Sequence, residues 1–475
     1  MSGFHERTRV WCFTCKAEHP AEAFEADGAV QCRVECPHAP DTVFTLSSDV
    51  ELFTHFRSFP QSPAARRYQF ALLHVTDRCS MKCPICFASS GDGSPASVEE
   101  VLEKARIAKD AGVKAVSLTG GEPTEHPALE EMIRRLKREI GLKVVLITNG
   151  LAFSRDASLA ARLRRTGLSK VVISFDTLSP ETSRLMRGDD YVEAKLSAFE
   201  RAAAAGLGLA ANMTVCERNI CEVGSVFRLL ATRFPALTHV LFQPFADFGR
   251  RSLHDRIDRE RIVRALCESR EFPVEMFESF VPAPNVPAFG IGVHPDCCAV
   301  CAVSARGTGS RARLSPLASA AAMRRLCERL AAIDGSGLLP PSLRALLAWV
   351  RFAGMRRLPL FAHRWLCGFG GRAVLAVVDN LPNREFMLSE RIERCGSALA
   401  CADGSLYPVC AAYRMGKERK RGNRFDCPGA GRMFRARSST WYADAIASAR
   451  RVSTAVHHPS SRLRRSGRNF LPFDG

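Results

Sequence analysis

The sequence Cys79-Ser-Met-Lys-Cys83-Pro-Ile-Cys86 places three cysteines in one short segment, which closely follows a strand predicted at residues 69–75. Three cysteines on one loop can each bind one iron of a cubic [4Fe–4S] cluster. The fourth iron then has no protein ligand and stays open to a small molecule. A zinc knuckle without its last ligand, or three buried cysteines, is the simpler interpretation of these residues taken alone.

The sequence around this loop alternates short apolar runs with amphipathic segments over residues 68–250, which is typical of βαβ units on a parallel sheet. Six strands in this order predict an α/β fold with a partial (β/α)6 barrel of the TIM type, and with its chemistry at the carboxyl ends of the strands. We expect strands at 69–75, 113–118, 143–148, 170–175, 207–214 and 239–244, and helices at 98–111, 128–140, 157–165, 191–205 and 222–233.

Composition narrows the class of protein. The chain has 475 residues, with 67 Lys and Arg against 49 Asp and Glu, so the formal net charge is 67 − 49 = +18. An apolar fraction of 46% argues against wholesale disorder and against a multi-span membrane protein. The first ten residues lack the apolar core of a secretory signal, so we expect a cytoplasmic protein. In that compartment its 19 cysteines more often bind metals than form disulfides.

A second group of cysteines lies near the start of the chain. Cys12 and Cys15 form one pair, and Cys32 and Cys36 form another. Two pairs at ligand spacing predict a four-thiolate site for zinc or a rubredoxin-like iron, in a small domain at residues 1–60. His19 and His38 lie nearby and are alternative ligands, although a single histidine near a loop is more often a surface residue.

The cysteine triplet has a family resemblance. Together with Phe87 and the segment Gly120-Gly121-Glu122-Pro123 one strand later, it resembles the radical S-adenosylmethionine (radical SAM) superfamily. The resemblance implies that Cys79, Cys83 and Cys86 hold a [4Fe–4S] cluster and that the glycine-rich segment meets the amino group of S-adenosylmethionine. It also implies ligand contacts from polar residues at later strands, for which capping of a strand or helix is the alternative: Thr148, Asn149, Ser174, Asp176, Asn212 and Gln243.

The resemblance carries a chemical expectation. A reduced cluster passes one electron to the sulfonium of S-adenosylmethionine, and the resulting 5′-deoxyadenosyl radical abstracts hydrogen from an unactivated C–H bond. Such an enzyme needs a one-electron donor such as a ferredoxin or flavodoxin as a partner.

The N-terminal cysteines and the run HVTDRCSMKCPICFA at 74–88 are similar to one subgroup of that superfamily, the pterin C-methylating and tetraether lipid synthase-like proteins. The resemblance implies an auxiliary [4Fe–4S] cluster in a C-terminal region at 251–429. Its expected ligands are Cys297, Cys301, Cys395 and Cys410, with Cys298, Cys401 and Cys427 as further candidates. Packing as small buried hydrophobic residues is the alternative for each. Residues 430–475 are rich in Arg and Ser and predict a disordered basic tail.

Three functions remain open on the sequence. The first is radical SAM chemistry on a lipid or pterin-like small molecule, with C–C bond formation or methylation; a helical segment at 338–354 and the positive charge then fit peripheral contact with an anionic membrane. The second is the same chemistry on a peptide. The third is a non-catalytic zinc protein that binds nucleic acid, but we expect no nucleic-acid partner because the arginines are not interleaved with aromatic residues.

Overall fold

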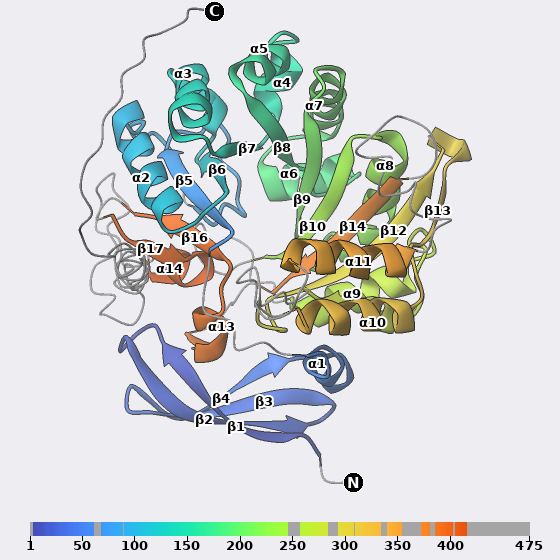
Figure 1. The fold of residues 1–475 in the computed structure, drawn as a ribbon. Helices are drawn as coiled ribbons and strands as arrows, with labels where there is room; N and C mark the ends of the chain where they lie inside the picture. Colours follow the sequence, from blue (N-terminus) through green and yellow to red (C-terminus); the bar gives the residue numbers. More distant parts are fainter. Residues whose placement is uncertain are drawn as a thin grey trace, which may run out of the picture.

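The computed structural model describes residues 3–60, 68–88, 90–245, 257–283, 293–307, 309–333, 340–353, 372–380, 385–401 and 404–415. Over these residues the chain forms two sheets, a large one that carries the cysteine triplet and a small one at the N-terminus (Figure 1). Cys427 and the basic tail expected at 430–475 lie outside the described residues.

The centre of the large sheet is a run of parallel strands that matches the predicted pattern. Each strand pairs with the next one along the chain. Few of their residues are exposed, so these strands read as continuous apolar runs in the sequence. They are β5 (Phe70–Thr76), β6 (Ala115–Gly120), β7 (Lys143–Thr148), β8 (Leu168–Ser174), β9 (Gly208–Val215) and β10 (Leu237–Pro244). The predicted α/β architecture is confirmed.

Helices lie along the outer side of these strands (Figure 1). The five expected helices are present as α2 (Val98–Asp110), α3 (Leu129–Arg135) with a π-helical turn at Leu136–Ile140, α5 (Leu159–Thr166), α7 (Val192–Ala204) and α8 (Val223–Arg233). Two short helices were not expected, α4 (Leu151–Arg155) and α6 (Pro180–Arg187). The ends of α6 are nonetheless marked in the sequence, because Ser179 caps it, proline opens it and Gly188 closes it in the left-handed region.

Strands from the C-terminal region extend the same sheet at both edges. Beyond β10 lie β14 (Arg372–Asp379), parallel to it, and then β12 (Cys298–Arg306), antiparallel to β14, with short partners β11 (Val281–Pro282) and β13 (Arg313–Pro316). Beyond β5 lie β16 (Ser397–Ala400), parallel to it, and β17 (Leu406–Pro408). The described part of the C-terminal region therefore shares the sheet and the core of the barrel.

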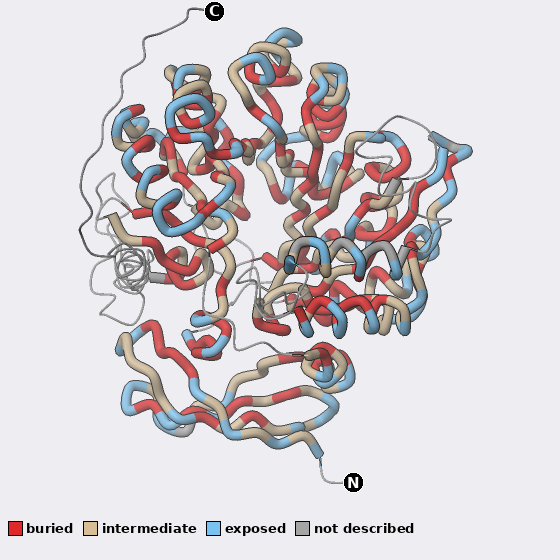
Figure 2. The backbone as a smooth tube through the Cα atoms, in the orientation of Figure 1, coloured by how far each residue is buried: buried red, intermediate tan, exposed pale blue. Residues whose placement is uncertain are grey.

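The N-terminal sheet is an antiparallel meander of β1 (His5–Cys12), β2 (Ala17–Ala26), β3 (Ala29–Cys36) and β4 (Ala39–Ser47), followed by α1 (Val50–Arg57). Its fifth strand, β15 (Phe386–Leu388), comes from the C-terminal region and pairs with β1. Buried residues alternate with exposed or intermediate ones along β3, whereas along the central strands of the large sheet buried residues alternate mostly with intermediate ones and few are exposed (Figure 2). Arg57 on α1 lies 3.1 Å from Asp296, so ion pairs as well as β15 join the two sheets.

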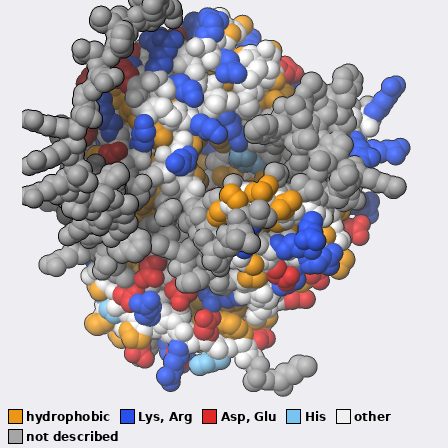
Figure 3. Space-filling view, in the orientation of Figure 1, with side chains coloured by type: hydrophobic (Ala, Val, Ile, Leu, Met, Phe, Trp, Pro, Cys, Tyr) orange, Lys and Arg blue, Asp and Glu red, His pale blue; other side chains and the backbone are white. Residues whose placement is uncertain are grey.

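The remaining described helices are α9 (Arg259–Glu268), α10 (Ala320–Ala331), α11 (Pro341–Ala353), α13 (Ser389–Glu393) and α14 (Val409–Met415). The segment expected at 338–354 is α11, which packs against α10 and exposes Leu343 and Leu347. Figure 3 shows hydrophobic side chains gathered over this helix, with basic side chains beside them. None of the described helices has the length and apolarity needed to cross a membrane.

Candidate functional site

The loop that carries the cysteine triplet is fastened at its base to the end of β5. The backbone N–H of Cys79 donates to Gly91 O at 2.9 Å, and the N–H of Gly91 donates to Asp77 O at 2.9 Å. Within the loop, the N–H of Cys86 donates to Cys83 O at 3.2 Å. These bonds hold both ends of the triplet loop against the mouth of the barrel.

Gly120 and Gly121, at and just after the end of β6, allow the backbone at the base of the triplet loop to pack directly against them. The N–H of Gly121 donates to Thr76 O at 2.6 Å, and the N–H of Glu122 donates to Arg78 O at 2.8 Å. A Cβ atom on Gly120 would lie 2.2 Å from Thr76 O, and one on Gly121 would lie 2.1 Å from Arg78 O. Only glycine permits this approach. The structure therefore gives both glycines a role in seating the cysteine loop, in addition to any contact with a ligand.

Glu122 fixes the same segment to the next strand. Its carboxylate accepts hydrogen bonds from Thr148 Oγ1 at 2.6 Å, from the Asn149 N–H at 2.7 Å and from Thr124 Oγ1 at 2.7 Å. The side chain of Asn149 accepts from the N–H of Leu151, the first residue of α4, at 2.8 Å. The described contacts of Thr148, Asn149 and Glu122 are all with other parts of the protein. These contacts position the segment between β6 and α4. Pro123 begins the single turn that follows.

The three cysteines share one apolar environment. Cys83 is buried in a cluster that includes Met186 and Cys216, and Cys79 and Cys86 pack against that cluster. Burial raises the pKa of the Cys79 thiol to about 12, and the charge of Glu122 adds to the shift. A metal that binds this thiol must displace its proton. The sulfur atoms of Cys79, Cys83 and Cys86 do not all lie within 4.8 Å of one another, as the ligands of a single ion would. Wider spacing suits three sulfurs that bind three different irons.

A buried network of charges adjoins the triplet. Arg187 on α6 forms a two-point ion pair with Asp176, with both N–O distances 2.7 Å, and it also hydrogen-bonds Cys83. Lys195 on α7 lies 3.5 Å from Asp176 and donates to Ser174 Oγ at 3.3 Å. Although burial opposes it, the two cations hold the pKa of Asp176 down to about 2. Burial lowers the pKa of Lys195 to about 8. Below that pH the two cations outnumber the one carboxylate, and the surplus positive charge lies beside Cys83.

Among the polar residues expected at the later strands, Asn212 on β9 has a buried side-chain atom without a hydrogen-bond partner in the described chain. Asn212 on β9 donates through Nδ2 to Gln243 Oε1 on β10 at 3.1 Å. Its other amide atom, Oδ1, is buried and accepts no hydrogen bond in the described chain. A buried acceptor without a donor costs free energy, so the position fits a ligand that carries hydrogen-bond donors, such as an amino group or a ribose. Together with the surplus positive charge, this atom shows that the residues present fit the expected cluster and S-adenosylmethionine.

Arginine 187 and Lys195 were not among the expected site residues. Charged side chains are usually solvated, and Arg187 lies at the end of α6, a helix that the sequence did not predict, so no pattern separated it from surface residues. Lys195 had a signal, because it stands among the apolar positions Val192, Leu196 and Phe199 that face the core. A lysine in the buried stripe of a helix points to a buried partner.

The C-terminal region brings a further set of cysteines together. Cys395 is buried, Cys297 and Cys410 are partly buried, and the three act electrostatically on one another; Arg391 lies near all three. Cys298 hydrogen-bonds Cys297, and that bond, helped by Arg391 and opposed by burial, lowers the pKa of Cys297 to about 6. Burial raises the pKa of Cys395 to about 11 and that of Cys410 to about 12.

Cys301 does not join this set, which corrects its place in the expected auxiliary site. It lies three residues after Cys298 on β12, and an odd step along a strand turns a side chain to the opposite face. There it is buried in the main hydrophobic core, and Cys267 is the cysteine that affects its pKa. Cys298 takes its place beside Cys297. Cys401, the other described candidate, packs in an apolar cluster with Trp11 and Tyr407.

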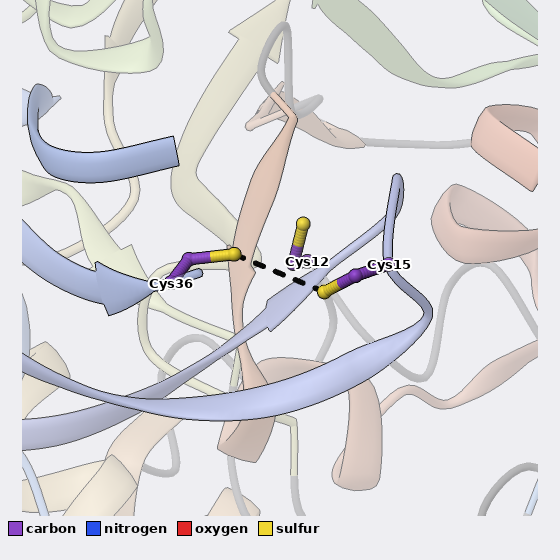
Figure 4. Close-up of side chains that lie close together, drawn as sticks. All are labelled: Cys12, Cys15 and Cys36. Atoms are coloured by element: carbon purple, nitrogen blue, oxygen red, sulfur yellow. Dashed lines mark hydrogen bonds between the residues drawn. The ribbon is translucent and has the colours of Figure 1, made fainter. Parts of the chain in front are cut away.

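The N-terminal cysteines form the one described group in which three ligand atoms lie within 4.8 Å of one another. Its members are Cys12 and Cys15, from the hairpin between β1 and β2, and Cys36 at the end of β3, and their sulfur atoms converge (Figure 4). Cys15 Sγ lies 3.8 Å from Cys36 Sγ and 3.0 Å from His19 Nε2. Backbone N–H groups of His38 and Ala39 donate to Cys36, so His38 contributes through its backbone. Cys32 is not in the group, so the expected set of four cysteines is wrong in that member.

Comparison with known proteins agrees with this arrangement. The family described as the radical SAM superfamily matches residues 73–230. The chain is 25% identical over 324 residues to a 7,8-dihydro-6-hydroxymethylpterin dimethyltransferase of Methanocaldococcus jannaschii, covering 61% of this chain and 63% of the relative. It is 31% identical over 198 residues to a GTP 3′,8-cyclase of Nitrobacter hamburgensis, covering 39% of this chain and 56% of the relative.

The chain thus spans less than two thirds of the length of these curated relatives. Among solved structures, Streptococcus suis SuiB bound to S-adenosylmethionine aligns with 46% of this chain and 48% of its own, at 17% identity and a TM-score of 0.37. The family match over 73–230 covers β5 to α8, the segment that contains the triplet, the glycine pair and the buried charges. Residues 73–230 are therefore a radical SAM domain.

Proposed function

We propose that this radical SAM enzyme binds a [4Fe–4S] cluster through Cys79, Cys83 and Cys86 and uses S-adenosylmethionine to abstract hydrogen from an unactivated C–H bond of a small organic molecule. The observation that carries the proposal is the seating of the triplet loop on Gly120 and Gly121. That close approach holds the triplet loop where Cys83 lies beside a buried surplus of positive charge, and β9 of the same sheet carries the unsatisfied Asn212 Oδ1.

When bound, the cluster and S-adenosylmethionine supply one-electron reduction and a carbon radical. The chain's own residues bind, orient and shield these groups. Arg187 and Lys195 place positive charge against the thiolate side of the cluster, and Asp176 holds both cations in position. Asn212 Oδ1 would accept a hydrogen bond from a donor group of the bound ligand. Met186 and the apolar cluster around Cys83 exclude water from the reacting atoms.

We also propose that Cys297, Cys395 and Cys410 hold an auxiliary [4Fe–4S] cluster, with Cys298 as the neighbouring thiol. Their sulfurs are buried around Arg391, whose charge offsets that of bound thiolates. Residues with raised thiol pKa values bind metal only on loss of their protons, so the arginine lowers the cost of assembly. This is the part of the expected auxiliary site that the described side chains support.

A pterin-like heteroaromatic molecule is the substrate class we favour, with C–C bond formation or methylation as the outcome. The support is the name of the Methanocaldococcus jannaschii relative, whose similarity extends over 61% of this chain. A lipid substrate and a peptide substrate remain the alternatives. A ferredoxin or flavodoxin is the one-electron donor that this chemistry needs.

The face formed by α10 and α11 supports a proposal of peripheral contact with an anionic membrane. Leu343 and Leu347 are 38% and 44% exposed, and Arg325, Arg329 and Arg351 are exposed on the same helix pair. Apolar side chains flanked by basic ones are typical of helices that lie on lipid headgroups. Binding to vesicles that contain anionic lipid, lost when both leucines are replaced by serine, would support this contact. Equal binding to neutral vesicles would contradict it.

The test of the radical function is anaerobic reconstitution with iron and sulfide, followed by dithionite and S-adenosylmethionine. We expect 5′-deoxyadenosine from the wild type and none from Cys83→Ala. Cys216→Ala is the matched control, because Cys216 is a buried cysteine of the same apolar cluster outside the triplet. It should keep its iron and its product. Product formation by Cys83→Ala, or equal loss in both variants, would contradict the proposal.

A further inference from the structure

We infer that the N-terminal group is a Cys3His zinc site, in which His19 takes the place expected for Cys32. The inference rests on the expectation from the sequence that this group binds a metal ion, and it goes further by naming the ligands. The sequence spacing of two cysteine pairs suggests four thiolates, whereas the strand register brings a histidine to the three cysteines and leaves the fourth cysteine away from them.

The register puts His19 in the middle of the group. On one side, His19 of β2 is opposite Val10 of β1, and Ala17 is opposite Cys12, so His19 and Cys12 share a face. On the other side, Ala21 of β2 is opposite Val34 of β3. Continuing that antiparallel ladder by two residues brings His19 opposite Cys36. His19 therefore stands on the central strand between two of the three cysteines, and its Nε2 lies 3.0 Å from the sulfur of the third, Cys15.

The same register removes Cys32 from the site. Cys32 is opposite Ala23 of β2 and Phe44 of β4. It stands four positions before Cys36 on β3, which at about 3.3 Å per residue is a distance of about 13 Å along the strand. Its side chain is fully buried. A ligand that must reach an ion about 2.3 Å from Cys36 Sγ cannot come from that position without breaking the pairing of β3.

The distances between the sulfurs fit a single tetrahedral ion, whereas His19, which adjoins Cys15, must shift toward the other two sulfurs to complete the set. Two sulfurs that are each about 2.3 Å from a tetrahedral zinc lie about 3.8 Å apart. The Cys15 and Cys36 sulfurs are 3.8 Å apart, and all three sulfurs lie within 4.8 Å of one another. Three thiolates and one imidazole complete a closed set of four ligands, which is one of the usual structural zinc sites.

The position of the site indicates what the ion does. Cys12 is opposite Phe386 of β15, and the N–H of Phe13 donates to Glu385 O at 2.9 Å. The hairpin that carries Cys12 and Cys15 is thus the edge on which the C-terminal strand adds to the N-terminal sheet. An ion that fixes this hairpin stabilises the junction of the two sheets, because a frayed hairpin offers no edge for β15 to pair with.

The experiment compares four variants of the full chain, His19→Ala, His19→Cys, Cys32→Ala and Cys36→Ala, by zinc content and by competition with a chelator. We expect the wild type and Cys32→Ala to keep one zinc with equal affinity. His19→Ala and Cys36→Ala should lose at least tenfold in affinity, since even residues that only support a ligand are worth 10–100-fold. His19→Cys should restore binding.

Replacing zinc by cobalt gives a second readout. In the wild type it does not depend on whether any variant folds. The sulfur-to-cobalt charge-transfer absorption grows with the number of thiolates, so the wild type should show three and His19→Cys four. Loss of zinc in Cys32→Ala without loss in His19→Ala, or a four-thiolate spectrum from the wild type, would overturn the ligand assignment. Failure of the wild type to bind zinc or cobalt at all would instead overturn the metal proposal beneath it.

Discussion

Gly121→Ala tests the seating of the cysteine loop most directly. The φ of Gly121 is not in the left-handed region, unlike that of Gly120, so alanine can adopt its backbone conformation. The effect of the substitution is therefore steric. The new Cβ would lie 2.1 Å from Arg78 O, whereas real Cβ contacts are essentially never shorter than 3.0 Å. The loop and the glycine segment must separate by at least 3.0 − 2.1 = 0.9 Å.

A displacement of this size acts on the site more than on the fold. Overpacking of a tight contact costs about 1–3 kcal/mol of stability, whereas misplacing reacting groups by about 1 Å can lower a rate about 10²-fold. The loop carries the three expected cluster ligands, so its shift moves them relative to the ligand side of the barrel. We expect Gly121→Ala to fold, to assemble less cluster, and to form 5′-deoxyadenosine about 10²-fold more slowly per cluster.

The matched control is Gly91→Ala on the opposite side of the same loop. Gly91 also lies outside the left-handed region, and a Cβ there meets nothing within 4 Å. It should therefore keep its iron and its rate. The assays are iron counting, the electron paramagnetic resonance signal of the reduced cluster, and timed product formation. Full activity of Gly121→Ala would refute the close-approach reasoning, and so would an equal loss in both variants.

Three further predictions concern the buried charges and the auxiliary cysteines. Arg187→Ala leaves Asp176 buried without its two-point partner and should cost about 3–5 kcal/mol in urea denaturation, whereas stability close to the wild type would contradict the pairing. Lys195 has a pKa lowered from 10.5 to about 8 in the folded chain, so the unfolded chain binds more protons between those values. The free energy of unfolding should therefore rise with pH in that window, and rise less in Lys195→Met. Cys410→Ala should lose about four irons per chain, while Cys301→Ala should keep its iron and lose ~1 kcal/mol of stability to a small cavity; the opposite pattern would reverse our assignment of the two cysteines.

The barrel could be predicted from the sequence because the patterns that specify its strands and helices each lie within a short stretch of residues. Apolar runs of strand length alternate with amphipathic helices, and the structure places all six strands and five helices within a few residues of the expected bounds. The short helix α6 was missed because eight residues hold too few apolar repeats, although its capping residues were readable. The added edge strands were missed because β14 and β16 join the sheet through pairings with distant segments.

The site was predictable only as far as spacing along the chain defines it. The triplet and the glycine pair are sequence motifs, and the structure brings them together. Ligand choice in the N-terminal group depends instead on which residues face each other across three strands, and a CxxC spacing carries no such register. Cys301 shows the same limit: its distance along the chain from Cys297 suits a metal loop, but β12 turns it into the core.

The auxiliary cysteines lie where the two edges of the open sheet meet. Cys297 directly precedes β12 at one edge, whereas Cys395 and Cys410 flank the β16–β17 hairpin at the other. Polar contacts already join these edges: His294 Nε2 lies 3.6 Å from Glu390 Oε2, and Arg394 donates to Val293 O at 3.4 Å. A cluster bound by cysteines from both sides would cross-link the edges and close the barrel. Loss of that cluster should therefore loosen both edges together, which hydrogen exchange of β12 and β16 in Cys410→Ala would measure; faster exchange in one edge alone would show that the cluster belongs to that edge and does not bridge the two.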